Sequence, residues 1–179
     1  MKANPKEKIT IKAESLKSLS NIDLADLCNI TEQAIKAGGG FGWLKTPLRE
    51  TLHKYWKGLL LIQNRILIVG RLNDAIAGTL QLELQSHNNE AQKNIIKIAS
   101  HFVAPWARGY GLAKKIIDYA ELIAKENEGT CLQLDIRETQ EAAIHLFKSK
   151  GYKQWGENPN YAFVEGNTIK GLYFYKNIK

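Results

Sequence analysis

The sequence predicts an α/β (α+β) fold, a single domain in which a mixed, mostly antiparallel central sheet carries helices on both faces. The first observation is a period of two within residues 75–85, where Leu80, Leu82 and Leu84 alternate with polar residues as in a half-buried strand. The second is a helical period after residue 111, where the apolar stripe comprises Leu112, Ile116, Ile117, Ala120 and Ile123. Because the 179 residues contain no repeat, low-complexity tract or linker, we assign one domain to residues 1–179.

The start of the chain predicts one strand and one helix. Residues 8–13 (KITIKA) fit the strand, since apolar and polar residues alternate there. Residues 21–37 fit a helix that Ser20 caps and that the glycines at 38–40 end. The helix has one regularly spaced face, made of Leu24, Leu27, Cys28, Thr31 and Ile35.

A second helix is expected over residues 46–60, with Thr46 as its cap and Pro47 in its first position. Beyond it the pattern alternates between strands and helices, with a polar loop at 86–94. The order is hairpin strands 65–71 and 75–85, strand 95–103, a helix after residue 111, strand 130–137, helix 140–150, and short strands around 152–156 and 171–176.

Composition narrows the classes of partner. The net charge of +7 favours anionic ligands, but the lysines are dispersed and no nucleic-acid-binding motif is present. The longest apolar run, residues 59–62, is too short to span a membrane, and the first ten residues do not resemble a secretory signal. Cys28 and Cys131 suit a reducing compartment and have no metal-site spacing. We therefore expect a cytoplasmic protein with no metal, no nucleic acid and no membrane partner.

The stretch RGYGLA, residues 108–113, stands between a strand and a long helix. Amide groups in the first turn of a helix lack partners within the helix and attract anions. Glycines at 109 and 111 would let a phosphate approach the backbone, and Arg108 would add a positive charge. The turn therefore predicts a pyrophosphate site, although a plain strand-to-helix turn has the same composition.

Known phosphate-binding motifs decide between these interpretations. Leu112 and Ala113 stand where a P-loop requires Lys and Ser or Thr, and Lys114 stands where a dinucleotide fingerprint requires its third glycine. Residues 103–113 (VAPWARGYGLA) fit the pattern V-x-P-x-x-R-x-x-G-x-A, which resembles the acetyl-CoA motif of the GNAT superfamily of acyl-CoA N-acyltransferases. Residues 143–152 (AIHLFKSKGY) resemble the second motif of the superfamily. Finding both motifs in order is more specific than either alone.

The resemblance implies a GNAT-like fold and acetyl-CoA as co-substrate. Within the superfamily the chain looks most similar to the tabtoxin-resistance acetyltransferases, through stretches such as YWKGLLL and GYKQWGENPNYA. The resemblance places the acetyl carbonyl against backbone amides near Phe102 and Val103. The positions that it assigns to acetyl-CoA are Phe102, Val103, Arg108, Gly109, Tyr110, Gly111, Leu112, Ala113, Lys114, Gln140 and Phe147.

The sequence departs from the family pattern at two catalytic positions. Lys97 replaces a glutamate that many members use to accept the proton of the amine. Asp135 is our first candidate for that base, and His101 is the second, because its ordinary pKa suits proton transfer near neutrality. Each also has a plain structural interpretation, Asp135 as a helix cap and His101 as a packed strand residue.

Phe147 replaces the tyrosine that often protonates the CoA thiolate. Another tyrosine (Tyr152, Tyr161 or Tyr173) or a water could supply that proton.

We therefore expect an acetyl-CoA-dependent N-acetyltransferase in which a primary amine attacks the thioester directly in a ternary complex. The acceptor, a small molecule or a protein amine, would enter between the first two helices and a hairpin expected at residues 156–163. A homodimer is compatible with this interpretation. The alternative, suggested by Lys97 and Phe147, is a catalytically weak acyl-CoA-binding module.

Overall fold

The fold is built on a seven-stranded sheet, which we describe from a computed structural model for residues 9–39 and 42–178. The strand order is β1-β2-β3-β4-β5-β7-β6, and every neighbouring pair is antiparallel except β4 and β5. The predicted fold class is therefore confirmed. The strands are β1 (Ile11–Leu16), β2 (Arg65–Leu72), β3 (Ala75–Glu83), β4 (Ile95–Val103), β5 (Cys131–Arg137), β6 (Lys153–Val164) and β7 (Asn167–Asn177).

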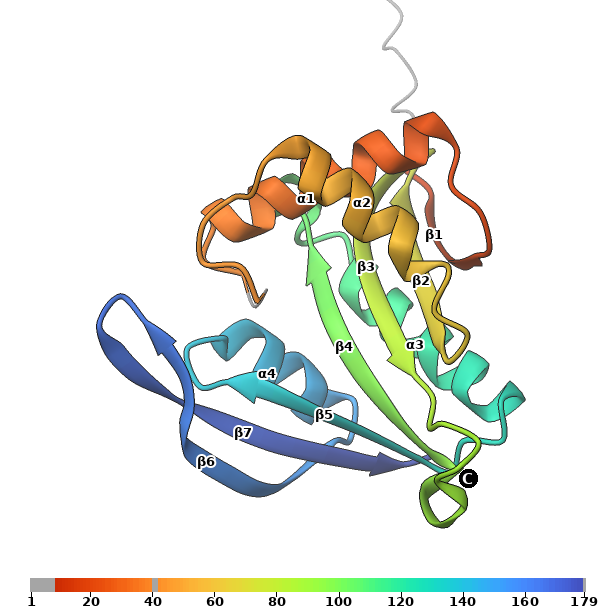
Figure 1. Cartoon of the computed structure of the whole chain (residues 1–179), viewed down its shortest axis with the longest axis vertical. Coiled ribbons are helices and arrows are strands. Elements are labelled where there is room, and N and C mark those ends of the chain that lie inside the picture. The colour runs from red at the N-terminus through yellow and green to blue at the C-terminus, as the bar shows by residue number, and fades with distance from the viewer. Residues whose placement is uncertain (1–8, 40–41, 179) are drawn as a thin grey trace, which may run out of the picture.

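Helices cover both faces of this sheet, as the alternation of side chains along β3 shows. On one face, Gln81 donates a hydrogen bond to the hydroxyl of Tyr55 on a helix. On the other face, Gly78 lies directly beneath Ile116 of a second helix. Figure 1 accordingly shows α1 and α2 together, with α3 on the far side of the strands. The helices are α1 (Asn21–Lys36), α2 (Arg49–Leu59), α3 (Leu112–Glu126) and α4 (Glu141–Ser149), and short 3-10 turns cover Glu90–Gln92 and Pro105–Ala107.

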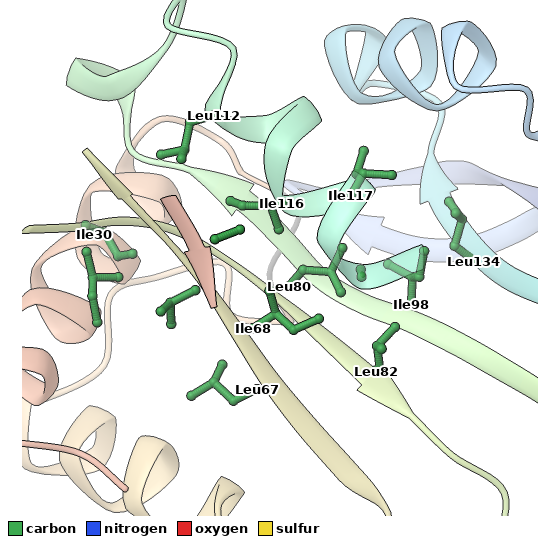
Figure 2. Close-up of a cluster of buried hydrophobic side chains, with 14 of the residues drawn as sticks. Ile30, Leu67, Ile68, Leu80, Leu82, Ile98, Leu112, Ile116, Ile117 and Leu134 are labelled. Carbon is green, nitrogen blue, oxygen red and sulfur yellow. The ribbon is translucent and has the colours of Figure 1, made fainter. Parts of the chain in front are cut away.

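The packing of α3 depends on two paired glycines. Gly70 of β2 and Gly78 of β3 lie opposite each other. A Cβ atom at Gly70 would lie 2.6 Å from Cδ1 of Ile116, and one at Gly78 would lie 2.9 Å from it. The missing side chains therefore make room for Ile116, which is fully buried beside Ile117 and Leu80 (Figure 2). Burying such a side chain stabilises the fold by about 1.5–3 kcal/mol.

The predicted limits of α1 are confirmed. The Ser20 side chain accepts a hydrogen bond from the Asp23 amide, and the Asp23 side chain accepts one from the Ser20 amide, which is a capping box. At the other end, Gly38 has φ 73° and donates to the carbonyl of Ile35, and Gly39 donates to the carbonyl of Ala34. These two bonds and the left-handed glycine form a Schellman motif. Gly40 lies outside the described residues.

The predicted start of α2 is wrong. The helix begins at Arg49, with Leu48 as an extended N-cap and no side-chain cap, so neither Thr46 nor Pro47 has its predicted role. The reason is tertiary. The Arg49 guanidinium donates to the carbonyl of Ala25 and to the side chains of Asn29 and Glu32 on α1. These bonds tie the first turn of α2 to α1, which a local capping signal does not reveal.

Four strands also differ from their predicted ranges by more than one residue, and β3 is one of them because it ends at Glu83 and not at residue 85. β1 covers Ile11–Leu16 because it pairs with β2 over that span, while Thr10 is bonded to Asn73 and residue 8 lies outside the described residues. β6 and β7 are long, and residues 156–163 lie within β6 instead of forming a hairpin of their own. The turn is at Glu165 and Gly166, whose φ values of 50° and 83° suit a tight hairpin between twisted strands.

Arg71 on β2 joins β1, β2 and α1. Its Nε lies 2.6 Å from a carboxylate oxygen of Glu14, and its Nη2 lies 2.7 Å from one of Asp23. Hydrogen bonds from Lys12 and Arg71 lower the pKa of Glu14. Burial alone would raise the pKa of Asp23, but the bonds from Ser20 and Arg71 outweigh burial and lower it. The cluster therefore favours both ionised carboxylates in the folded state.

Replacing Arg71 with Met should lower the free energy of unfolding at pH 7 by about 2–4 kcal/mol, because two partly buried carboxylates lose their partner. Since both carboxyl pKa values are lower in the folded state, this contribution is complete above the unfolded pKa of about 4 and is lost as the pH falls through the folded values. Denaturant unfolding between pH 3 and 7 measures it. An equal loss of stability at both ends of that range would contradict this assignment.

Candidate active site

Strands β4 and β5 separate, and the candidate site lies where they part. Their parallel pairing extends only over Ile95–Lys97 and Cys131–Gln133. Figure 1 shows the two strands meeting at one end and diverging toward the other. Within β4, Thr79 pairs with Phe102 but Gln81 pairs with Ala99, so β4 has one extra residue there. This β-bulge contains Ser100 with φ 49°, and such a bulge bends its strand and increases the local twist.

The bulge also decides which face His101 points to. Beyond it, Val103 Cγ2 would lie 3.0 Å from a Cβ at Gly78, on the face that α3 covers. His101 is two residues earlier and therefore points to the same face, where its ring meets the edge of Phe147 of α4 at 5.4 Å between centroids. Phe102 points to the opposite face. The two sides of the opening thus have different chemistry.

A large cavity of about 800 Å³ lies beside the glycine turn. Gly111 is the N-cap of α3 with φ 79°, and Gly109 has φ 86°. A Cβ at either glycine would meet no described atom within 4 Å, and no side chain caps the helix. Arg108 and Lys114 also line the cavity. Free amides at the positive end of a 15-residue helix, open space above two glycines and two cations suit a diphosphate.

Most of the positions predicted for acetyl-CoA meet at this cavity. Tyr110 is the exception among the turn residues, since it lines neither cavity and is 44% exposed. Phe147 lines a second, smaller cavity instead. The predicted residues that line the large cavity are Phe102, Val103, Arg108, Gly109, Gly111, Leu112, Ala113, Lys114 and Gln140.

Sequence reasoning missed the opposite wall of the large cavity. This wall combines the end of α1 with the first turn of α4 and comprises Ala34, Ala37, Gly38, Gly39, Thr139, Glu141, Ala142, Ala143 and Leu146, while Ala107 lines the cavity beside the glycine turn. The small residues at the end of α1 were the only sequence signal for this wall, and the tertiary fold is what brings them to the cavity. Gln140 Nε2 donates to the carbonyl of Gly38 at 2.8 Å, and Arg137 Nη2 donates to that of Gly39 at 2.9 Å. Both bonds tie α1 to the segment between β5 and α4.

The smaller cavity, about 100 Å³, passes between the separated strands and shares His101, Gln140 and Ala143 with the large one. Asp135 lies in its wall, 2.9 Å from Nζ of Lys97, and accepts a hydrogen bond from the hydroxyl of Tyr161. The bond to Asp135 raises the pKa of Lys97, so Lys97 remains a cation. The structure places Asp135 in an ion pair inside the cavity; α4 has no side-chain cap, so Asp135 does not cap it.

Tyr161 reaches Asp135 because of a glycine and an irregular strand. A Cβ at Gly171 of β7 would lie 2.2 Å from Cγ of Tyr161, so the ring lies directly on the backbone of β7. The pairing of β6 with β7 is irregular between Asn158 and Ala162, next to Pro159. Burial, followed by the bond to Asp135, raises the pKa of Tyr161, which keeps its hydroxyl protonated as a donor.

His101 is a weak base in this structure. Its Nε2 has no accessible surface and no hydrogen-bond partner among the described residues, although other parts of the residue are accessible. Burial lowers the pKa of His101 to about 4, and a hydrogen bond with the backbone of Ala113 only partly opposes this. The imidazole is therefore neutral at pH 7.

Phe147 is 2% exposed and also packs edge-on against Tyr152, with 5.0 Å between the ring centroids. Of the three tyrosines that could replace its missing hydroxyl, Tyr161 lines the smaller cavity, whereas Tyr152 and Tyr173 line neither cavity.

Among residues 9–39 and 42–178, no cluster of His, Cys, Asp and Glu could hold a metal ion. In the same part of the chain, no helix has the length and apolarity needed to cross a membrane.

Comparison with known proteins identifies the family. The model of the acetyltransferase (GNAT) family matches residues 27–152, which include the sheet from β2 to β5 and the glycine turn. The chain belongs to the GNAT acetyltransferase family. It is also 46% identical over 130 residues to an uncharacterized N-acetyltransferase from the hisH-hisA intergenic region of Azospirillum brasilense, covering 73% of this chain and 77% of that protein. This GNAT chain is therefore an acyltransferase.

Solved GNAT-like structures share the whole fold at low sequence identity. An N-acetyltransferase from Staphylococcus aureus Mu50 superposes with a TM-score of 0.79 at 17% identity, over 95% of this chain and 99% of that one. The yncA protein of Salmonella typhimurium, whose structure contains its cofactor acetyl-CoA, superposes with a TM-score of 0.76 at 14% identity, over 94% of each chain. The GNAT family uses acetyl-CoA, so the co-substrate predicted from the motifs agrees with the family.

An NMR titration can test the environment of His101. Because the folded pKa is about 4 and the ordinary value is 6.5, the unfolded chain binds more protons between these values. His101 should titrate near pH 4, and the free energy of unfolding should fall as the pH decreases from 6.5 to 4. In the His101→Gln variant this part of the pH dependence should disappear. A midpoint near 6.5 would show that water reaches Nε2.

Proposed function

We propose that the protein transfers an acetyl group from acetyl-CoA to a primary amine by direct attack in a ternary complex. The observation that carries the proposal is the opening between β4 and β5. It joins the cavity at the glycine turn to the cavity of Asp135, through the shared residues His101, Gln140 and Ala143. Two substrates can therefore meet between the strands while approaching from different sides.

The residues of the large cavity fit acetyl-CoA. The amides at the start of α3, between Gly109 and Lys114, would hold the diphosphate, and Arg108 would add charge to that contact. Bound there, acetyl-CoA supplies an activated thioester carbonyl. Backbone N–H groups near Phe102 and Val103 would stabilise the negative charge that develops on the carbonyl oxygen, as β5 does not pair with β4 at that level.

Asp135 is the proposed proton acceptor. Its carboxylate lines the smaller cavity, and Lys97 and the Tyr161 hydroxyl hold it in place. It can attract an ammonium group and take up the proton that the nitrogen must lose before its lone pair can attack the thioester. His101 remains the second candidate, but its low pKa and inaccessible Nε2 favour Asp135. Phe147 has no proton to give, so we expect the thiolate to leave unaided or to be protonated by water or Tyr161.

The other predicted features belong to the same proposal. The acceptor would reach the cavity between α1, α2 and residues 156–163 of β6. The protein would be a cytoplasmic domain within residues 1–179, with a small-molecule or protein amine as partner, either monomeric or as a homodimer. Membership of the tabtoxin-resistance-like subgroup is proposed on the quoted sequence stretches alone.

Free CoA release with a panel of primary amines distinguishes an enzyme from a non-catalytic acyl-CoA-binding module. Amine-dependent release above the rate without amine supports transfer. Tight acetyl-CoA binding without such release for any amine would support the binding module instead.

The Gly111→Glu variant should lose acetyl-CoA binding, because its carboxylate would project into the open space above the turn and repel the diphosphate. Gly111→Ala is the matched control, since it imposes the same strain of a side chain at φ 79° without charge. We expect Gly111→Ala to lose less than tenfold in affinity by calorimetry. Unchanged affinity in a folded Gly111→Glu protein would place the site elsewhere.

The Asp135→Asn variant should lose about a hundredfold or more in kcat, with little change in acetyl-CoA affinity, because it keeps the shape but removes the proton acceptor. Asp118→Asn is a matched control, since Asp118 on α3 is also paired with a lysine, Lys150, but lines neither cavity. His101→Gln tests the second candidate in the same assay. If Asp135→Asn and His101→Gln both retain wild-type rates and pH profiles, neither residue accepts the proton.

A further inference from the structure

Arg137 is a cation in the smaller cavity and has no carboxylate partner among the described residues. It lines that cavity together with Asp135 and Tyr161. Its one hydrogen bond in this part of the chain goes from Nη2 to the carbonyl of Gly39. A guanidinium has five N–H donors, so most of its donor capacity remains available.

The position of Arg137 relative to Asp135 suits a ligand with two opposite charges. The residues are two apart on β5 and therefore point to the same face, where they pair with Gly171 and Tyr173 of β7. Two residues along a strand cover about 6.5–7 Å. Asp135 forms an ion pair with Lys97, whereas no carboxylate within residues 9–39 and 42–178 forms one with Arg137. The cavity therefore presents the Asp135 carboxylate to an amine and, two residues further along β5, a guanidinium that the described carboxylates leave unpaired.

Tyr161 lies between these two charged groups. Its ring covers Gly171, the partner of Arg137 across the sheet, and its hydroxyl donates to Asp135. Burial raises the pKa of Tyr161, and the charge of Arg137 partly opposes that rise, so the guanidinium is close to the phenol. Tyr161 thus forms a side wall that both ends of a small ligand would touch.

We propose that the acetyl acceptor is an amino acid, with its carboxylate bound by Arg137 and its amine directed to Asp135. This inference rests on the proposed acetyl transfer and names its substrate class. Arg–carboxylate contacts are strong and directional, which would position the nitrogen at the opening between the strands. A free amino acid has a carboxylate beside its amine, whereas the first residue of a protein chain has that carboxyl group in a peptide bond, so a cavity that contains Arg137 favours the free amino acid.

The reaction balances without a further reactant. The amine nitrogen forms a bond to the acetyl carbon, the carbon–sulfur bond breaks, and CoA leaves as a thiolate. The ammonium nitrogen first gives one proton to Asp135, which passes it to water, and the neutral amine then attacks. A second proton leaves the nitrogen to water as the amide forms, and the thiolate takes up a proton from water, so one proton is released overall. The carboxylate on Arg137 is unchanged, so the product is an N-acetylamino acid and the role of Arg137 is to position the substrate.

The test compares each amino acid with its decarboxylated amine and its methyl ester: alanine with ethylamine, methionine with 3-(methylthio)propylamine, and phenylalanine with phenethylamine. CoA release gives kcat/KM for each acceptor. At least one amino acid should exceed its amine and its ester by about tenfold to a hundredfold, the usual cost of losing a hydrogen bond to a charged group. The amine of the methyl ester is less basic than that of the amino acid and is therefore more easily deprotonated. A slower reaction of the ester than of the amino acid therefore cannot arise from poorer deprotonation.

In the Arg137→Gln variant, kcat/KM for the amino acid should be close to kcat/KM for its decarboxylated amine. Arg137→Lys keeps the charge and should retain part of the preference for the amino acid. If Arg137 served only to hold Gly39, both acceptors would lose the same factor in kcat/KM and their ratio would not change, which would overturn the inference. Equal wild-type rates within every series would overturn it too while leaving acetyl transfer intact. Absence of CoA release with every amine would contradict the proposed function itself.

Discussion

The separation of β4 from β5 is the constraint on which the rest of the site depends. Parallel pairing ends after three residues of each strand, and the bulge at Ser100 bends β4 away. A continuous ladder would leave no opening in the sheet and no unpaired backbone beyond Lys97. The fold can tolerate the gap because each strand keeps its other neighbour, β3 for β4 and β7 for β5. The broken ladder therefore costs stability locally without dividing the sheet.

Helices on both faces of the sheet are fixed in place beside the opening between β4 and β5. On one face, α3 is anchored where Ile116 fits over Gly70 and Gly78, which fixes the position of its N-terminus and of the glycine turn. On the other, α1 is tied to the segment after β5 by Gln140 and Arg137. The same Schellman motif that ends α1 thus supplies the carbonyls of Gly38 and Gly39 for these bonds. Helix termination and cavity formation are two results of one local geometry.

The electrostatics of the opening differ between its two faces. Asp135, Lys97 and Tyr161 form a polar group on one side, to which we assign the amine. On the other side, His101 is kept neutral by burial beside Phe147. This asymmetry follows from the bulge, because the extra residue decides that His101 points to the face of α3 and α4. An acylated thiol on the apolar side and an amine on the polar side would each meet suitable surroundings.

Local patterns in the sequence determined the order of the elements, the glycine turn and both limits of α1. Each depends on neighbouring residues alone: the period of a strand, the stripe of a helix, the capping box at Ser20 and the left-handed glycine at Gly38. The positions around Gly111 that we propose for acetyl-CoA also follow from a contiguous motif. Tyr110 shows the limit of such reasoning, because a contiguous motif does not reveal which side chains face outward.

Only the tertiary structure decided what depends on distant partners. The start of α2 is set by Arg49 bonding to α1, and the extent of β6 and β7 by their mutual pairing. Asp135 pairs with Lys97 because β4 and β5 converge at one end. Tyr161 reaches Asp135 because Gly171 has no side chain to exclude the tyrosine ring. None of these contacts has a signal within a few residues of sequence, because each joins groups that are close in space and far apart along the chain.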